Sequence, residues 1–311
     1  MRKRLTAAAL AAVTLFAAGC SNENTPGEDA IQVTGSATVE PITSYMADRY
    51  DFNVNVEAIG STDGFAKFCD GDADINDASV AIPGAGAPVD FQKQCADNGV
   101  EFVELPIALD AITIVKHRDN DWAQDLTIQQ LHDIWAADSA VTKWSDIDPA
   151  WPDEEITLYG RPSGSGTLGV FEELVLGGDE IREDYDATDD IQELSAWVAD
   201  DVNALSFMGI GNYLATEGEV RDKIDNVLVD GIAPTAEETK SGNYPLARPL
   251  FLYVNKDSAE RDDVAEFVTT YLDKVEAVLP RVYFYQLPEE DYDTAKQRFE
   301  DRTLGADARW H

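Results

Sequence analysis

Basic residues are scarce in this chain of 311 residues, which has 23 lysine and arginine residues against 60 aspartate and glutamate residues, for a formal net charge of −37. Such an excess of negative charge repels polyanions, so the chain is not a nucleic-acid-binding protein that acts by neutralising phosphates. Cysteine and histidine are also rare, with three of each. They provide little material for a metal centre, and we expect no metal and no cofactor.

Long apolar runs are absent beyond the N-terminus, so nothing after residue 20 is long enough to span a membrane. Residues 1–19 have three basic residues followed by an apolar stretch, which is typical of a signal peptide. The stretch ends Ala17-Ala18-Gly19-Cys20, which resembles a bacterial lipobox. We expect Cys20 to be lipidated and residues 20–29 to tether an extracytoplasmic domain to the cell membrane. An ordinary secretory signal with a chance cysteine is the alternative.

Two cysteines remain, Cys69 and Cys95. An even pair in an exported protein favours a disulfide, which would close a loop of about 26 residues. Two free buried thiols are the alternative.

Strand-length apolar runs alternate with helical patterns along the chain, which predicts an α/β fold with a mostly parallel sheet. Residues 111–115 and 249–254 are the clearest strands, and about 130 residues lie between them. We therefore expect two lobes joined by two crossing strands, with a cleft between them. Lobe I comprises residues 30–113 and 247–311, and lobe II is the inserted segment 114–246.

Three turns rich in glycine, serine and threonine each lie between a predicted strand and a predicted helix, at residues 34–38, 60–64 and 161–167. The N-terminus of a helix has unpaired N–H groups and a partial positive charge, so it binds anions. Arg161 adds a planar cation suited to an oxyanion. The three turns together predict an anion site, and three ordinary N-caps are the alternative.

The motifs of these turns resemble those of the PstS family, the phosphate-binding proteins of bacterial phosphate ABC importers. The matching segments are TGSATVEPIT (34–43), IGSTDGFAKFCDGDADINDAS (59–79), RPSGSGT (161–167), ALSFMGIGNYL (204–214), YPLARPLFLYVN (244–255) and RTLG (302–305). The resemblance covers nearly the whole mature chain. It implies a periplasmic-binding-protein-like fold whose two lobes close on one phosphate, and it also supports the disulfide.

Carried over by position, the resemblance implies a set of phosphate-binding residues on both lobes. The set consists of Thr38, Val39, Ser61, Thr62, Ser79, Arg161, Ser165, Gly166 and Thr167. Many members of the family have an aspartate at the position of Ser79, where it accepts a hydrogen bond from the proton of the phosphate. Some members likewise have an aspartate at the position of Ser163, where it steadies the arginine. This chain lacks both carboxylates.

Sulfate carries no proton at neutral pH, and a carboxylate acceptor rejects it because two oxygen lone pairs then face each other. The nearest carboxylates in the sequence are Asp63 and Asp77, and we expect one of them, Asp63 in particular, to be the proton acceptor. The alternative is that Asp63 caps the helix that follows it.

The function expected from the sequence is capture of inorganic phosphate by a monomeric, lipid-anchored solute-binding protein that serves an ABC permease. No catalytic residues are expected: Ser165 does not lie in a G-x-S-x-G motif, and no lysine follows the glycines as in a Walker loop. The same architecture binding another oxyanion such as sulfate or arsenate, or acting as an anion sensor without transport, is the alternative.

Overall fold

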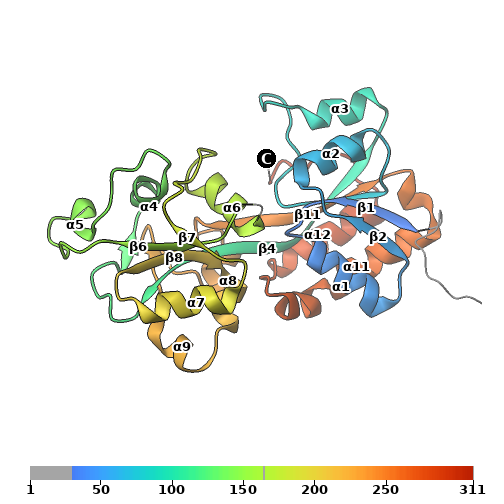
Figure 1. Cartoon of the computed structure of the whole chain (residues 1–311). Helices are drawn as coiled ribbons and strands as arrows, with labels where there is room; N and C mark the ends of the chain where they lie inside the picture. Colours follow the sequence, from blue (N-terminus) through green and yellow to red (C-terminus); the bar gives the residue numbers. More distant parts are fainter. Residues whose placement is uncertain (1–29, 164, 311) are drawn as a thin grey trace, which may run out of the picture.

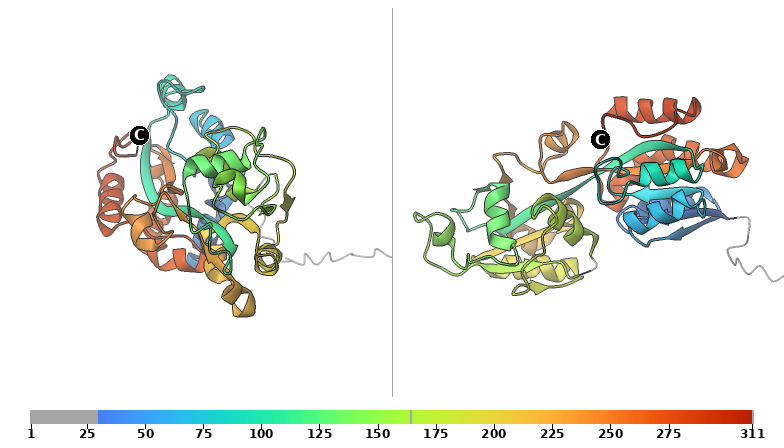
Figure 2. Two further views of the ribbon diagram at one scale, coloured as in Figure 1. Left: turned by 90° about the vertical axis from the view of Figure 1, so that its left-hand side faces the viewer. Right: turned by 90° about the horizontal axis from the view of Figure 1, so that it is seen from above.

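The computed structural model describes residues 30–163 and 165–310, which form two α/β lobes joined by two long strands (Figure 1). The view from above separates the two lobes equally clearly (Figure 2). The expected fold class is confirmed. The predicted signal peptide, the lipidation site at Cys20 and the tether lie outside the described residues.

Lobe I has a sheet with helices on both faces. Strand β1 (Ile31–Gly35) pairs in parallel with β2 (Val54–Glu57) and β3 (Ile75–Ala78), and β3 pairs antiparallel with β11 (Ala247–Asn255). The helical segments of this lobe are α1 (Glu40–Tyr50), α2 (Ser61–Cys69), α3 (Phe91–Asp97), η1 (Ser258–Glu260), α11 (Asp262–Val282) and α12 (Glu289–Glu300).

The sequence of β11 explains how this sheet is covered on two sides. Leu250, Leu252 and Val254 belong to the apolar cluster formed with α1, α11 and α12. Phe251 and Tyr253 belong to the cluster formed with α2 and α3. Alternate residues of a strand point to opposite faces, so the near-continuous apolar run fills a core on each side.

The two lobes share strand β4 (Phe102–His117). Its residues 102–111 pair antiparallel with β11 in lobe I, and its residues 112–116 pair antiparallel with β8 (Ala204–Gly209) in lobe II. The change of partner falls between Ala111 and Ile112. Any rotation of one lobe against the other must therefore act on this part of β4 and on the start of β11.

Lobe II extends the sheet from β8. Strand β6 (Thr157–Gly160) pairs in parallel with β8 and with β7 (Asp186–Ala187), and β9 (Ile224–Asn226) pairs with β4. The other elements of this lobe are β5 (Asp125–Leu126), α4 (Ile128–Trp135), α5 (Trp144–Ile147), α6 (Gly166–Leu174), α7 (Ile191–Asp200), α8 (Ile210–Ala215), α9 (Gly218–Lys223), β10 (Leu228–Val229) and α10 (Ala236–Lys240).

Aromatic side chains fill the centre of lobe II. Trp135 is fully buried and meets Phe171 and Phe207 edge-on, with ring centroids 5.5 and 5.1 Å away. Trp144 is also fully buried. These tryptophans therefore belong to the core of the lobe, where their large apolar area stabilises the fold.

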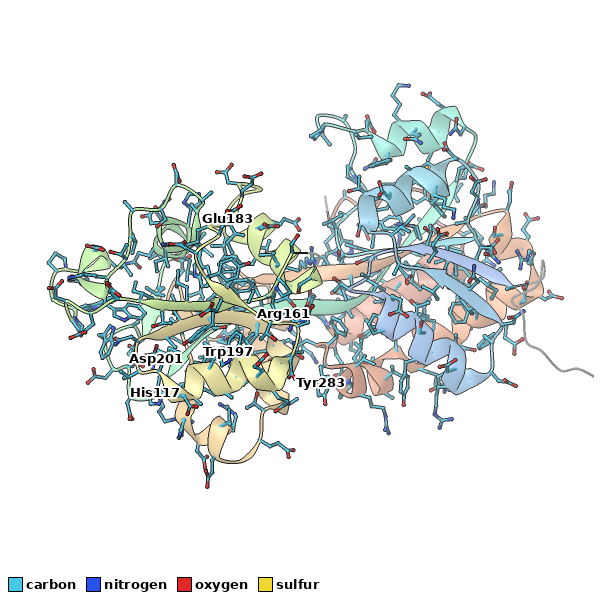
Figure 3. The ribbon with its side chains drawn as sticks, in the orientation of Figure 1. His117, Arg161, Glu183, Trp197, Asp201 and Tyr283 are labelled. Atoms are coloured by element: carbon cyan, nitrogen blue, oxygen red, sulfur yellow. A yellow bond between two sulfur atoms is a disulfide. The ribbon has the colours of Figure 1, made fainter. Side chains whose placement is uncertain are left out.

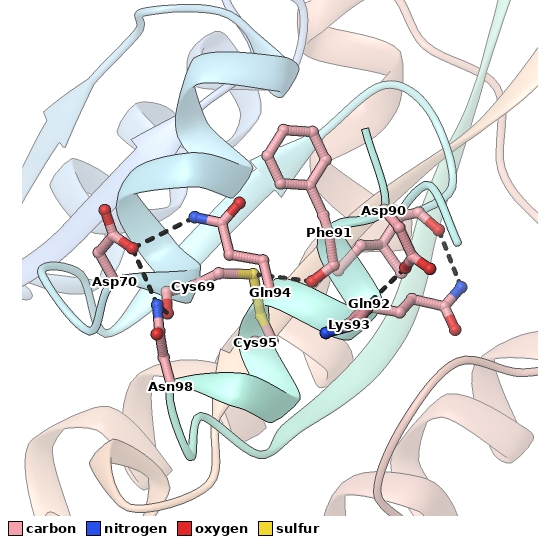
Figure 4. Close-up of a disulfide and its surroundings, with 10 residues drawn as sticks. Cys69, Asp70, Asp90, Phe91, Gln92, Lys93, Gln94, Cys95 and Asn98 are labelled. Atoms are coloured by element: carbon pink, nitrogen blue, oxygen red, sulfur yellow. Dashed lines mark hydrogen bonds between the residues drawn. A yellow bond between two sulfur atoms is a disulfide. The ribbon is translucent and has the colours of Figure 1, made fainter. Parts of the chain in front are cut away.

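Cys69 and Cys95 form a disulfide, as expected from the sequence. It joins the last residue of α2 to α3 (Figure 4). The surrounding apolar cluster contains Phe65, Phe68 and Phe91. The bridge therefore fastens α3 to the outer face of lobe I.

None of the described helices combines the length and the apolar character needed to cross a bilayer. Across residues 30–163 and 165–310, no three histidine, cysteine, aspartate or glutamate side chains gather as metal ligands would.

Candidate functional site

A cavity of about 250 Å³ lies where the two lobes meet. Lobe I contributes Thr38 at the entry to α1, and lobe II contributes Arg161 together with residues 165–167. Asp110 from β4 and Tyr283 from the end of α11 also line it. Figure 3 shows Arg161 and Tyr283 at the junction of the lobes. Five of the predicted phosphate-binding residues are thus brought together from both lobes.

The first predicted turn leaves β1 through Gly35, whose φ is +129°. A Cβ at this position would lie 1.9 Å from the carbonyl oxygen of Asp77, so only glycine fits here. The Ser36 N–H donates to the same carbonyl, and the Ser36 hydroxyl accepts the N–H of Thr38 at 3.1 Å. These bonds hold Thr38 at the cavity wall.

Val39 does not reach the cavity wall. Its side chain is fully buried, and its backbone N–H donates to the carbonyl of Ser36 at 3.1 Å. In this arrangement the backbone N–H of Val39 is already paired within the turn.

The second predicted turn, at residues 60–64, already belongs to α2, which begins at Ser61. The preceding Gly60 has a φ of +95°. The Ser61 hydroxyl accepts the N–H of Ser79 at 3.1 Å and lies 3.2 Å from the Ser79 hydroxyl. Thr62 is exposed on the same helical turn. None of Ser61, Thr62 and Ser79 lines the cavity.

A chain of hydroxyls nevertheless connects the two turns of lobe I. The Ser36 hydroxyl donates to that of Ser79 at 3.0 Å, and Ser79 continues to Ser61. Ser36 was not among the residues predicted to bind the anion, although it lies in the predicted turn. These linked hydroxyls fix the backbone behind Thr38, since the Ser36 hydroxyl also accepts the N–H of Thr38.

The third turn places Arg161 next to the first turn of α6. The Arg161 Nη1 donates to the carbonyls of Thr188 at 3.1 Å and Asp189 at 2.8 Å, and Nη2 lies 3.5 Å from the Asp189 carboxylate. Asp189 therefore holds the guanidinium of Arg161 in place. Ser163, which has no carboxylate, cannot form such an ion pair. No local pattern near Arg161 indicates Asp189, because the two residues are 28 positions apart.

The N-terminus of α6 supplies the remaining groups on lobe II. Ser165 is the N-cap, and helix α6 begins at Gly166. Free N–H groups at such a helix start, with the Thr167 hydroxyl and the Arg161 guanidinium, form an arrangement that binds a small anion. An oxyanion in the cavity would meet these donors from lobe II and Thr38 from lobe I.

The lobes approach each other closely at two glycines. A Cβ on Gly166 would lie 2.7 Å from the Thr38 Oγ1, and a Cβ on Gly211 would lie 2.0 Å from the Tyr283 Cβ. Tyr283 itself caps α11 in the left-handed conformation, with a φ of +65°. A side chain at Gly211 would collide with the backbone of Tyr283, and one at Gly166 would displace the Thr38 hydroxyl, so both positions belong to the interface. Sequence patterns gave no indication of Tyr283.

The two carboxylates predicted as proton acceptors lie away from the cavity wall. Asp63 is exposed in the first turn of α2. Asp77 is 1% exposed, and its Oδ2 accepts the hydroxyl of Thr43 at 2.8 Å, next to Tyr271 of α11. Burial, together with the nearby Glu40, raises the pKa of Asp77 to about 8.

Asp110 is the carboxylate that lines the cavity, and the sequence analysis did not select it. It interrupts the apolar run of β4, and a charged residue in such a run is the sequence signal that could have identified it. Its side chain is 13% exposed, and its Oδ2 lies 3.6 Å from Nε of Arg248. Arg248 also binds Glu173 of α6, with Nη1 to Oε2 at 2.8 Å. Burial raises the pKa of Asp110, and the charge of Arg248 partly opposes this effect.

Comparison with known sequences gives consistent matches over most of the chain. A family model described as the PBP superfamily domain matches residues 21–273. Protein SphX of Synechocystis sp. is 35% identical, over 95% of this chain and 89% of that protein. Phosphate-binding protein PstS of Staphylococcus saprophyticus is 29% identical, over 94% of this chain and 90% of that protein.

Solved structures with the same architecture include a possible phosphate binding protein from Planctomyces limnophilus. It has a TM-score of 0.78 and 32% sequence identity, and the match covers 88% of this chain and 98% of that chain. An ABC-type phosphate transport receptor from Vibrio cholerae has a TM-score of 0.66 at 20% identity, covering 82% of this chain and 99% of that chain. At that identity the second likeness supports the fold alone.

Proposed function

The chain belongs to the PstS family of phosphate-binding proteins within the PBP superfamily, and from this premise we propose that it captures inorganic phosphate outside the cytoplasmic membrane and delivers it to the permease of an ABC importer. The observation that carries the proposal is the cavity between the lobes. It combines Thr38 of lobe I with Arg161 and the start of α6 in lobe II, which are suitable donors for one small oxyanion.

Phosphate is held by direct contacts from both lobes. Arg161 supplies the positive charge, and Thr38, Ser165, Gly166 and Thr167 donate hydrogen bonds through hydroxyl or backbone groups. Val39, Ser61, Thr62 and Ser79 complete the set on lobe I. For this, the Val39 N–H and the Ser61 and Ser79 hydroxyls exchange their bonds within the lobe for bonds to the anion. Ligand binding thus selects the closed arrangement of the lobes.

The bulk charge of the protein opposes capture, because the net charge is −37 and the ligand is an anion. The site must therefore gain its affinity locally, from charge-assisted hydrogen bonds in a small and partly dehydrated cavity. Members of this family are solute-binding receptors rather than enzymes, and we extend this to the present chain, which needs no cofactor for such a role.

The remaining parts of the proposal concern the whole mature protein. Residues 1–19 are removed as a signal peptide, Cys20 is lipidated, and residues 20–29 tether the monomer to the membrane. Lobe I is assigned to residues 30–113 and 247–311, and lobe II to residues 114–246. The apolar and basic pattern of the N-terminus supports the anchor.

Calorimetric titration of the ligand-stripped mature protein with phosphate, arsenate and sulfate tests the function. We expect tight binding of phosphate, with Arg161→Lys weakening it by about 10- to 100-fold because lysine cannot form the bidentate fork. Arg49→Lys, an exposed change on α1, is the matched control and should leave the affinity unchanged. Preference for sulfate would favour the other-oxyanion alternative, and absence of binding to all three anions would overturn the proposal.

A further inference from the structure

Asp110 is the acidic side chain among the described residues that line the cavity between the lobes. On the basis of the proposed function, we propose that the Asp110 carboxylate accepts a hydrogen bond from the protonated oxygen of the bound anion. By this contact it selects protonated oxyanions such as phosphate and arsenate against sulfate.

The position of Asp110 suits this role. Its backbone pairs with Arg248 on β11, and Thr38, Arg161 and Thr167 line the same cavity. One side of the carboxylate faces Arg248. The other side is available to the cavity, since 13% of the side chain is exposed. The carboxylate therefore reaches the ligand space while most of it is shielded from water.

Arg248 leaves the carboxylate with acceptor capacity. The guanidinium forms its short hydrogen bond with Glu173, at 2.8 Å, and its Nε lies 3.6 Å from the carboxylate of Asp110, beyond hydrogen-bond distance. A carboxylate can accept several hydrogen bonds. The O–H of a protonated oxyanion in the cavity would fill an acceptor position that Arg248 does not occupy.

The hydroxyls of lobe I cannot perform the same selection. Ser36, Ser61 and Ser79 bond to one another, and a hydroxyl can rotate to donate to an unprotonated oxygen as readily as it accepts from a protonated one. An ionised carboxylate has no proton to donate. It therefore repels an oxygen of sulfate, and a desolvated contact of this kind costs far more than a lost hydrogen bond.

The other two candidate carboxylates face different surroundings. The Asp77 carboxylate points to Thr43 and the α11 side of lobe I, and Asp63 is exposed on α2. Neither lines the cavity. They provide matched controls, because each can be changed to asparagine without altering the cavity wall.

The test is calorimetric titration of the whole mature protein with phosphate, arsenate and sulfate, for the wild type and for Asp110→Asn, Asp63→Asn and Asp77→Asn. We expect Asp110→Asn to lower the ratio of phosphate to sulfate affinity by at least about 100-fold, because the asparagine amide can donate to sulfate. Arsenate affinity should fall in parallel with that of phosphate. The two control variants should keep the wild-type ratio.

The outcomes separate this inference from the proposed function. If the wild type binds phosphate selectively and Asp110→Asn keeps the ratio, or weakens phosphate and sulfate equally, the inference is overturned and the phosphate function stands. If Asp63→Asn instead lowers the ratio of phosphate to sulfate affinity, the inference is also overturned. If the wild type binds no phosphate, the proposed function itself fails. Should Asp110→Asn not fold, Asp110→Ser gives the same readout, because a hydroxyl can also donate to sulfate.

Discussion

Two aspartates of the central sheet have different surroundings, and these surroundings favour different roles for them. Asp77 lies on β3 behind the first turn, where its carboxylate meets Thr43 and its carbonyl accepts the Ser36 N–H. Asp110 lies on β4 at the cavity and has Arg248 beside it. The first residue supports the fold of lobe I, and the second is available to a ligand.

Replacing Asp77 by asparagine should change how stability depends on pH. The folded state raises the pKa of Asp77 from 3.8 to about 8, so between these values it binds one more proton than the unfolded state. The wild-type free energy of unfolding therefore loses up to about 1.4 kcal/mol per pH unit through this residue as pH rises over that window. Asp77→Asn lacks this loss. Urea unfolding at several pH values between 4 and 8 measures the difference.

Asp63→Asn is the control for this prediction, since it removes an exposed carboxylate from the neighbouring helix. The gap in stability between Asp77→Asn and the wild type should widen as pH rises, by more than the corresponding gap for Asp63→Asn. Equal pH profiles for the wild type and Asp77→Asn would show that Asp77 is ionised in the folded state across the range.

Helix α6 connects ligand contact to lobe contact through its first turn. Gly166 begins the helix, and the Oγ1 of Thr38 on the other lobe lies 2.7 Å from the place of an added Cβ. Gly169, on the same helix, is exposed and has no atom within 4 Å of its Cβ position. The same substitution at the two glycines therefore separates an effect on lobe contact from an effect on helix propensity.

Gly166→Ala should weaken phosphate binding by about tenfold or more, because the added methyl group displaces the Thr38 hydroxyl from its place at the ligand. Gly169→Ala should leave the affinity unchanged and stabilise the protein by up to about 1 kcal/mol through helix propensity. Calorimetric titration and urea unfolding of both variants provide the measurements. Equal affinities for the two variants would contradict the assignment of Gly166 to the interface.

The disulfide belongs to the periphery of lobe I, between α2 and α3. Replacing both Cys69 and Cys95 by alanine should lower the free energy of unfolding by about 3–4 kcal/mol, the entropy cost expected for a loop of this length. Phosphate affinity should remain within about twofold, because neither residue lines the cavity. Denaturant unfolding and titration test the two parts, with reduced wild type as the matched control. A large loss of affinity in the folded variant would show that α3 acts on the site.

At the scale of the whole molecule, local patterns predicted the elements, and long-range contacts determined the details of the site. The apolar runs at 111–115 and 249–254 lie within β4 and β11, and the three small-residue turns lie at helix starts. Asp189 and Tyr283 escaped prediction because they reach the site only through tertiary packing. Asp110 is a charge within an apolar strand, but it lies far along the chain from all three turns, so no local pattern connects it with the site.

The acidic surface should make stability depend on salt. With a net charge of −37, self-repulsion disfavours the compact state, and the screening length falls from about 10 Å at 0.1 M to about 3 Å at 1 M salt. We expect the urea midpoint of unfolding to rise between 0.05 and about 1 M sodium chloride. Sucrose at matched osmolarity is the control for a general solvent effect. An unchanged midpoint would contradict a destabilising role for the charge.

The most direct test of the account is a crystal structure of the mature protein with phosphate. The account predicts one phosphate between the lobes, bonded to Thr38 and to the segment from Arg161 to Thr167, with a phosphate oxygen within hydrogen-bond distance of Asp110. A phosphate bound elsewhere on the protein, or bound between the lobes without contact to Arg161, would contradict it.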